Sequence, residues 1–152
     1  MLVVIAIIGV LASVVLASLN SARSKGNNAA VKTNLANARS QAELFYSFNG
    51  EKYMGTAGSA DDVCSSTALT STGSIKGIYL NLTAAAKAVG TTTINTTATV
   101  AGTTTSATCH SSDSAWAMEV PLSSGGMHCV DNRGTSIPTA STTLAASDYA
   151  CN

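Results

Sequence analysis

Charged residues are scarce in this chain, and neither sign is in excess. Its 152 residues include 8 Lys and Arg against 8 Asp and Glu, so only 11% are charged, where about 25% is usual for a soluble domain. A nucleic-acid-binding protein would carry a clustered basic excess, so we expect no nucleic-acid partner. Disorder is excluded as well, because 45% of the residues are hydrophobic and can bury enough surface to fold.

Catalytic motifs are also lacking. The chain has no phosphate-binding glycine loop, no G-x-S-x-G and no H-E-x-x-H sequence, each of which carries a recognisable chemistry. The only two histidines, His110 and His128, are expected to be surface residues rather than catalysts. We therefore predict that the chain is not an enzyme and that it holds no cofactor and no metal.

Hydrophobic residues are concentrated at the N-terminus. Residues 1–19 contain no ionisable side chain, and as a helix they would be about 28 Å long, close to the thickness of a bilayer's hydrocarbon core. A cleaved secretory signal would have basic residues before the apolar run. A buried core helix would need a larger protein around it. We therefore predict a membrane-spanning helix.

The cysteines indicate an oxidising compartment. All four follow the apolar run and none forms a C-x-x-C pair: Cys64, Cys109, Cys129 and Cys151. An even number of cysteines after a membrane or export segment favours disulfides. Two of them neighbour a histidine, but adjacent residues in a strand point to opposite faces, so zinc chelation is disfavoured. Of the three possible connectivities we prefer Cys64–Cys109 with Cys129–Cys151, because these bonds close separate loops.

The charges near the apolar run conflict with that location. Residues 1–42 carry four positive charges and no negative ones, namely Arg23, Lys25, Lys32 and Arg39. Basic residues next to a membrane helix usually stay in the cytoplasm, which would place the C-terminal part inside. The disulfides place it outside, so we infer that another signal sets the orientation.

The helix is expected to continue beyond the membrane. Apolar residues alternate at spacings of four and three over 27–48, which forms one stripe on a helix: Val31, Leu35, Ala38, Ala42 and Phe45. Asn49 and Gly50 form a suitable stop, since glycine takes the left-handed cap conformation easily. A helix from residue 1 to 48 would be about 72 Å long, so a small head cannot cover all of it.

The N-terminal third of the chain resembles a known family. The run LVVIAIIGVLASVV, the Ala/Asn/Ser-rich helix after it and its end LFYSFNGEKY are similar to the N-terminal half of a type IV pilin or pseudopilin. Supporting positions at the helix end are Tyr46, Asn49, Gly50 and Tyr53. The resemblance covers residues 1–53 and implies a long helix packed on a small antiparallel sheet, with an inner-membrane assembly platform and an ATPase motor as partners.

The chain departs from that family at its start. Family members are made with a basic leader that a prepilin peptidase removes before Phe-Thr-Leu-Ile-Glu, and neither segment is present here. Met1 and Leu2 match the positions that follow that glutamate. Our hypothesis is that Met1 is an internal methionine and that the leader lies upstream, where its basic residues would hold the N-terminus inside the cell.

The remaining residues predict an α+β head. We expect three regions: a hydrophobic transmembrane or filament-core half of the helix (1–26), an amphipathic half (27–50) and a β-rich head with two disulfides (51–152). Within the head, the patterns predict a loop at 54–74, a strand at 75–82, a helical turn at 83–89, a Thr-rich hairpin at 91–108, strands at 116–120 and 127–130, and a loop at 132–152. The strand at 116–120 is expected to have one buried face.

The expected function is structural. A rod too long for its head should pack against other copies of the chain, which makes a helical homopolymer. The residues expected to pack in the filament core are Leu2, Ile5, Ala6, Gly9, Ala12, Ser13 and Leu16. Before assembly the subunit would reside in the cytoplasmic membrane, and afterwards in a pilus or similar filament at the cell surface.

Two other functions stay open. A pseudopilin of a type II secretion or DNA-uptake system would have the same rod and a similar head. A single membrane-anchored adhesion or binding domain would use the rod only as an anchor.

Asn81 and Asn95 begin N-x-[ST] sequences and are candidate glycosylation sites.

Overall fold

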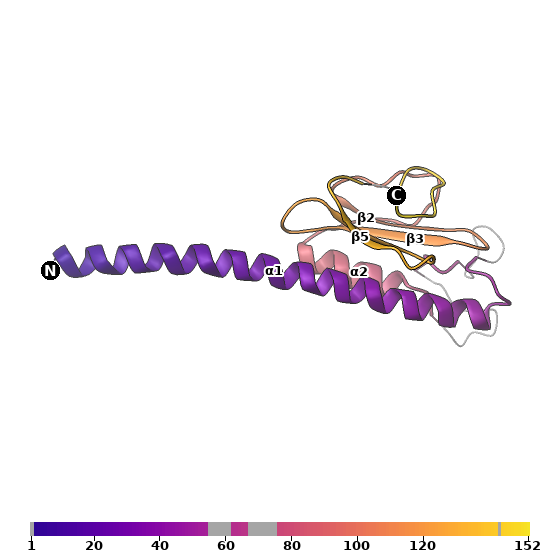
Figure 1. Cartoon of the computed structure of the whole chain (residues 1–152), viewed down its shortest axis with the longest axis horizontal. Coiled ribbons are helices and arrows are strands. Elements are labelled where there is room, and N and C mark those ends of the chain that lie inside the picture. The colour runs from indigo at the N-terminus through magenta and orange to yellow at the C-terminus, as the bar shows by residue number, and fades with distance from the viewer. Residues whose placement is uncertain (1, 55–61, 67–75, 143) are drawn as a thin grey trace.

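The chain folds as a long helix that packs along part of its length on a small head (Figure 1). The computed structural model describes residues 2–54, 62–66, 76–142 and 144–152, with the side chain of Leu2 left out. Helix α1 (Leu2–Phe48) is followed by helix α2 (Tyr79–Val89) and by five strands. These are β1 (Thr93–Asn95), β2 (Ser106–Ser111), β3 (Trp116–Pro121), β4 (Met127–Asp131) and β5 (Ser136–Thr139). The expected α+β class is confirmed.

The strands form one sheet in the order β1-β2-β3-β4-β5. Three neighbouring pairs are antiparallel, whereas β1 runs parallel to β2 with Ile94 opposite Ala107. The sheet is therefore mixed and not purely antiparallel. Strands β3 and β4 meet at the expected turn, where Gly125 and Gly126 have φ of 90° and 76°. A side chain at residue 126 would also lie 2.5 Å from the carbonyl oxygen of Thr139, so only glycine fits there.

The main core lies between one face of the sheet and the two helices. The apolar stripe of α1 and the buried residues of α2 contact the inward side chains of β2, β3 and β4, among them Trp116, Met118 and Val130. Figure 1 shows α1 and α2 side by side beneath the sheet. A second layer of loops covers the opposite face of the sheet, where Ala117, Cys129 and Leu144 are buried together.

This second layer corrects the expectation for β3. All six residues of β3 are buried, including Ala117 and Glu119 on the outer face. Thr142 donates a hydrogen bond to Glu119 at 2.7 Å, so the C-terminal segment covers the carboxylate. The alternation along 116–120 predicted one buried face. The prediction failed because the pattern of a single strand carries no information about a loop, distant in the sequence, that covers its other face.

The predicted strand at 75–82 is wrong over its described part. Residues 79–82 begin α2, while Ile75 lies outside the described residues. Ile78 and Leu82 are fully buried and Leu80 is 58% exposed, which is the spacing of a helix. The alanines at 84–86 favour a helix more strongly than the apolar alternation before them favours a strand. As expected, Gly90 ends the helix in the left-handed conformation.

The predicted hairpin at 91–108 is wrong too. The tract forms β1 and the start of β2, which are parallel and therefore need a crossover in place of a tight turn. Gly102 lies in that crossover against the outer face, where an added Cβ would collide with Oε1 of Glu119. The predicted loop at 132–152 contains β5, and most of the predicted loop at 54–74 lies outside the described residues.

Candidate assembly surface

Residues 3–19 of α1 project beyond the head (Figure 1). The large hydrophobic side chains between Val3 and Leu19 are all exposed, from 54% at Ile7 to 71% at Val3. The helix is long and apolar enough to cross a membrane, and its most apolar window is wholly unburied. A core helix of a soluble protein would be covered by its own chain, so that interpretation does not apply to this segment.

The residues expected in the filament core belong to this projecting part. Ile5, Ala6, Gly9, Ala12, Ser13 and Leu16 are all exposed, and the side chain of Leu2 lies outside the described residues. Ala6, Gly9, Ser13 and Ala17 are spaced by three, four and four residues, so they share one face of the helix. Ser13 donates to the carbonyl oxygen of Val10 at 2.8 Å. The side chains on this face are small, and the hydroxyl of Ser13 already has a hydrogen-bond acceptor. Both properties permit close packing against another helix.

The second half of α1 is fixed to the head by its apolar stripe. Every member of the stripe is fully buried: Val31, Leu35, Ala38, Ala42 and Phe45. These are the residues expected from the sequence to pack on the sheet. This part of the helix therefore has one buried face, whereas residues 3–19 have none.

Polar contacts hold the same half of the helix in register. Asn28 accepts a hydrogen bond from the backbone of Ser123 at 2.8 Å and donates to the hydroxyl of Ser124 at 2.7 Å. Further along, Gln41 donates to the carbonyl oxygen of Lys76 at 2.6 Å. The helix is thus anchored at both ends of the head, which fixes the direction in which residues 2–26 project.

An aromatic cluster closes the end of α1. The rings of Tyr46 and Tyr53 lie 4.6 Å apart, and Tyr53 meets Trp116 edge-on at 6.5 Å. The hydroxyl of Tyr53 donates to Glu43 at 2.7 Å. Burial, followed by this bond to a carboxylate, raises the pKa of the Tyr53 phenol far above its usual range. The helix stops at Phe48, and Gly50 takes a φ of 69°, as the sequence predicts.

Both disulfides form, with the pairing that the sequence favoured. Cys64–Cys109 ties the loop before α2 to β2 in the main core, and Cys129–Cys151 ties the C-terminus to β4 on the outer face. The Cα atoms are 5.7 and 5.8 Å apart. Because all four sulfurs are in disulfides, none is available to zinc.

The two histidines are not at the surface, contrary to the expectation. His110 is fully buried, and its ring nitrogens lie 3.0 Å from the carbonyl oxygen of Asp148 and 2.9 Å from that of Val100. It therefore joins the crossover loop to the C-terminal segment. His128 is 5% exposed and lies 3.2 Å from the hydroxyl of Ser136. Burial, followed by the charge of Lys32, lowers the pKa of the His128 imidazole.

The two candidate glycosylation sites are half-buried. Asn81 lies within α2 and Asn95 ends β1. Sequence motifs do not report such an environment.

Comparisons of the chain with protein-family models, with curated proteins and with solved structures found no match.

Proposed function

We propose that this chain is a structural subunit of a type IV pilus or pilus-like filament. The observation that supports the proposal most strongly is the exposed apolar segment of α1 from Val3 to Leu19. An exposed apolar surface of this extent marks a membrane or protein interaction site. The head supplies no cover for it, so lipid or other copies of the chain must do so.

The proposed cycle has two states of the same rod. The subunit first waits in the cytoplasmic membrane with residues 3–19 among the lipid tails. It then joins a helical polymer, in which helix–helix contacts along Ala6, Gly9 and Ser13 replace lipid contacts. Small residues make this exchange favourable, because closely packed backbones gain dispersion energy that disordered lipid tails do not provide. The heads form the outer shell of an extracellular filament.

Assembly requires partners that the resemblance to type IV pilins implies. These are an inner-membrane platform with an ATPase motor, and a prepilin peptidase if a leader precedes Met1. The fixed angle between rod and head supports repeated identical contacts, since each copy presents the same surfaces in the same orientation. A repeated head-to-tail contact that does not close produces a helical fibre.

The test is to shear surface filaments from cells that make the chain, image them by electron microscopy and identify their subunit by mass spectrometry. Gly9→Leu should abolish the filaments, since it places a bulky side chain on the small face of the rod. Val4→Phe is the matched control, because Val4 is exposed on the side of the helix opposite that face, and filaments should persist.

The two alternatives give different results in the same experiment. A pseudopilin would give short, sparse filaments, and Gly9→Leu would still remove them. A single anchored binding domain would give no filaments, and Gly9→Leu would leave its surface level unchanged. The last outcome would overturn the proposed function.

A further inference from the structure

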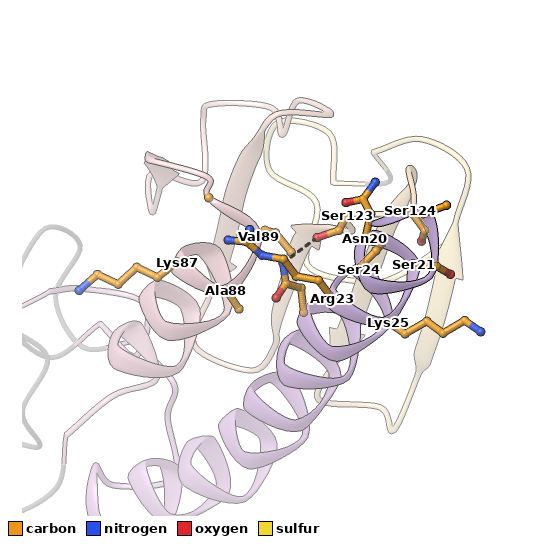
Figure 2. A pocket seen from close by; sticks show the side chains of 13 residues that line it. Asn20, Ser21, Arg23, Ser24, Lys25, Lys87, Ala88, Val89, Ser123 and Ser124 are labelled. Carbon is orange, nitrogen blue, oxygen red and sulfur yellow. Dashed lines mark hydrogen bonds between the residues drawn. The ribbon is translucent and has the colours of Figure 1, made fainter. Parts of the chain in front are cut away.

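An open groove lies where the projecting half of α1 leaves the head (Figure 2). It has a volume of about 660 Å³, within the range of ligand sites. Its walls come from three elements: residues of α1 between 17 and 27, the end of α2 at 87–90, and the β3–β4 turn at Ser123 and Ser124. A hydrogen bond of 3.4 Å from Asn27 to Ser123 closes it on the head side.

The chemistry of the lining favours an anion. Three cations line the groove, namely Arg23, Lys25 and Lys87, and no carboxylate from the described residues lines it with them. Figure 2 shows the Arg23 side chain reaching from α1 toward Val89 at the end of α2, while Lys25 and Lys87 extend outward on opposite sides. The remaining polar groups are hydroxyls and amides, which donate hydrogen bonds to phosphate oxygens readily.

One element that lines the groove, the helix α2, disfavours the binding of an anion. The carboxyl end of α2 faces the groove and carries about half a negative charge. Two of its last four carbonyl oxygens are already occupied, since Gly90 donates to Lys87 at 3.1 Å and Thr91 donates to Ala86 at 2.9 Å. Arg23 reaches across the groove, and its full positive charge outweighs this partial charge, while Lys25 and Lys87 at the rim add to the positive potential.

The position of the groove points to the membrane surface. Leu19 is the last large hydrophobic residue of the projecting run, and a helix rises 1.5 Å per residue, so Arg23 lies about 6 Å beyond it and Asn27 about 12 Å. The headgroup region on each side of the hydrocarbon core is about 5–8 Å thick. With residues 3–19 in the bilayer, Arg23 lies at the level of the lipid phosphates, and Lys25 lies just beyond it.

We propose that this groove binds the phosphate headgroup of an anionic phospholipid and so sets the depth of the subunit in the membrane before assembly. The inference rests on the part of the proposed function that inserts residues 3–19 into lipid. It goes beyond that function in assigning a lipid class and the residues that recognise it. A glycerophosphate headgroup suits the groove, because it is anionic and carries hydroxyls that Ser123, Ser124 and the α1 serines can bond.

The test uses the full chain in micelles of a neutral detergent, followed by amide NMR. Short-chain phosphatidylglycerol, short-chain phosphatidylcholine and inorganic phosphate are titrated separately. Phosphatidylglycerol should give saturable shifts at the amides of residues 87–90, Ser123 and Ser124. Phosphatidylcholine should give none there, and inorganic phosphate should bind at least tenfold more weakly, because it lacks an acyl chain held in the micelle.

Charge variants with equal net charge separate the groove from a general electrostatic effect. The triple variant R23Q/K25Q/K87Q should weaken phosphatidylglycerol binding on the order of a hundredfold, at about fivefold per cation near a charged surface. The control K52Q/K76Q/R133Q removes three cations that do not line the groove and should change binding by less than about twofold. All six residues are exposed, so both variants should fold.

The possible outcomes are distinguishable. Equal binding of both lipids, or equal loss in the two triple variants, would overturn the headgroup site while leaving filament assembly untouched. Inorganic phosphate binding as tightly as the lipid would assign the groove to a soluble anion and contradict the proposal. A chain that fails to insert into neutral phosphatidylcholine vesicles, measured by flotation in high salt, would overturn this inference and the proposed function together.

Discussion

The two halves of α1 belong to one continuous helix but differ in burial. Residues 27–48 bury a full apolar stripe against the head, whereas residues 3–19 bury nothing although they are more hydrophobic. Gly26 lies between the halves without interrupting the helix. Hydrophobicity alone therefore does not decide what a chain buries within itself. A residue of α1 can be buried only where the head extends beside it, and the head ends at Asn27 and Asn28.

This difference separates folding from assembly. The stability of the monomer should depend on the second half of the helix and on the two disulfides. Polymer formation should depend on the first half. A substitution in one half should therefore leave the property governed by the other half unchanged.

The largest effect is expected at Phe45. Phe45→Ala removes the largest fully buried side chain of α1 and should lower the free energy of unfolding by about 3–5 kcal/mol. Ile8→Ala, in the exposed half, should change it by less than about 0.5 kcal/mol. Urea unfolding of the full chain in detergent, followed by the fluorescence of the buried Trp116, measures both. Similar losses in the two variants would contradict the division of the helix.

The next effect concerns the disulfide that holds the outer layer. Cys129→Ser/Cys151→Ser opens a loop with a sequence separation of 22 and should cost about 3 kcal/mol. The Cys64→Ser/Cys109→Ser variant opens a separation of 45 and should cost about 0.6 kcal/mol more. Thermal unfolding of both variants provides the measurement. A negligible effect of the first pair would mean that the covering layer stays in place without it.

A smaller effect is expected where the head ends. Asn28→Ala removes two hydrogen bonds to the β3–β4 turn and should cost about 1–2 kcal/mol. Asn37→Ala is the control, because Asn37 is exposed on the same helix and the same change there should be close to neutral. Hydrogen exchange at the amides of residues 24–30 should increase only in the first variant. An equal increase in both would place the boundary of the head elsewhere.

The smallest effect is a pH dependence at His128. Its pKa is lowered in the folded chain, so the unfolded chain binds the proton more readily once the pH falls below the ordinary value of about 6.5. The stability should therefore be highest above that value and decrease as the pH falls toward the lowered pKa of the folded state. His128→Gln should flatten this part of the profile between pH 7 and 5, as measured by urea unfolding. A wild-type head that gains stability over the same interval would contradict the sign.

Sequence patterns predict the features of this chain that nearby residues determine. The 3.6-residue period identifies the buried stripe from Val31 to Phe45, and the absence of charge identifies the projecting run before it. The Asn49-Gly50 stop, the Gly90 cap and the strands β3 and β4 are also found from local signals. These features depend on the helix or turn that contains them, so nearby residues are sufficient to reveal them.

The remaining features depend on tertiary packing. The outer layer over Glu119 and His110 comes from loops that carry no periodic pattern, so both residues were expected in less buried surroundings. The Thr-rich tract has high β propensity, but propensity does not distinguish a parallel strand from a hairpin. The groove at Arg23 and Lys87 joins residues that are 64 positions apart in the chain. No local pattern in the sequence predicts this contact.

The most direct test of the central claim is the association state of the purified full chain after detergent is removed. Sedimentation velocity should show large assemblies of the wild-type chain and a return to a dispersed, folded subunit when detergent is restored, because residues 3–19 have no cover of their own. A monodisperse monomer that stays soluble without detergent, with residues 3–19 protected from hydrogen exchange by contact with its own head, would contradict the account.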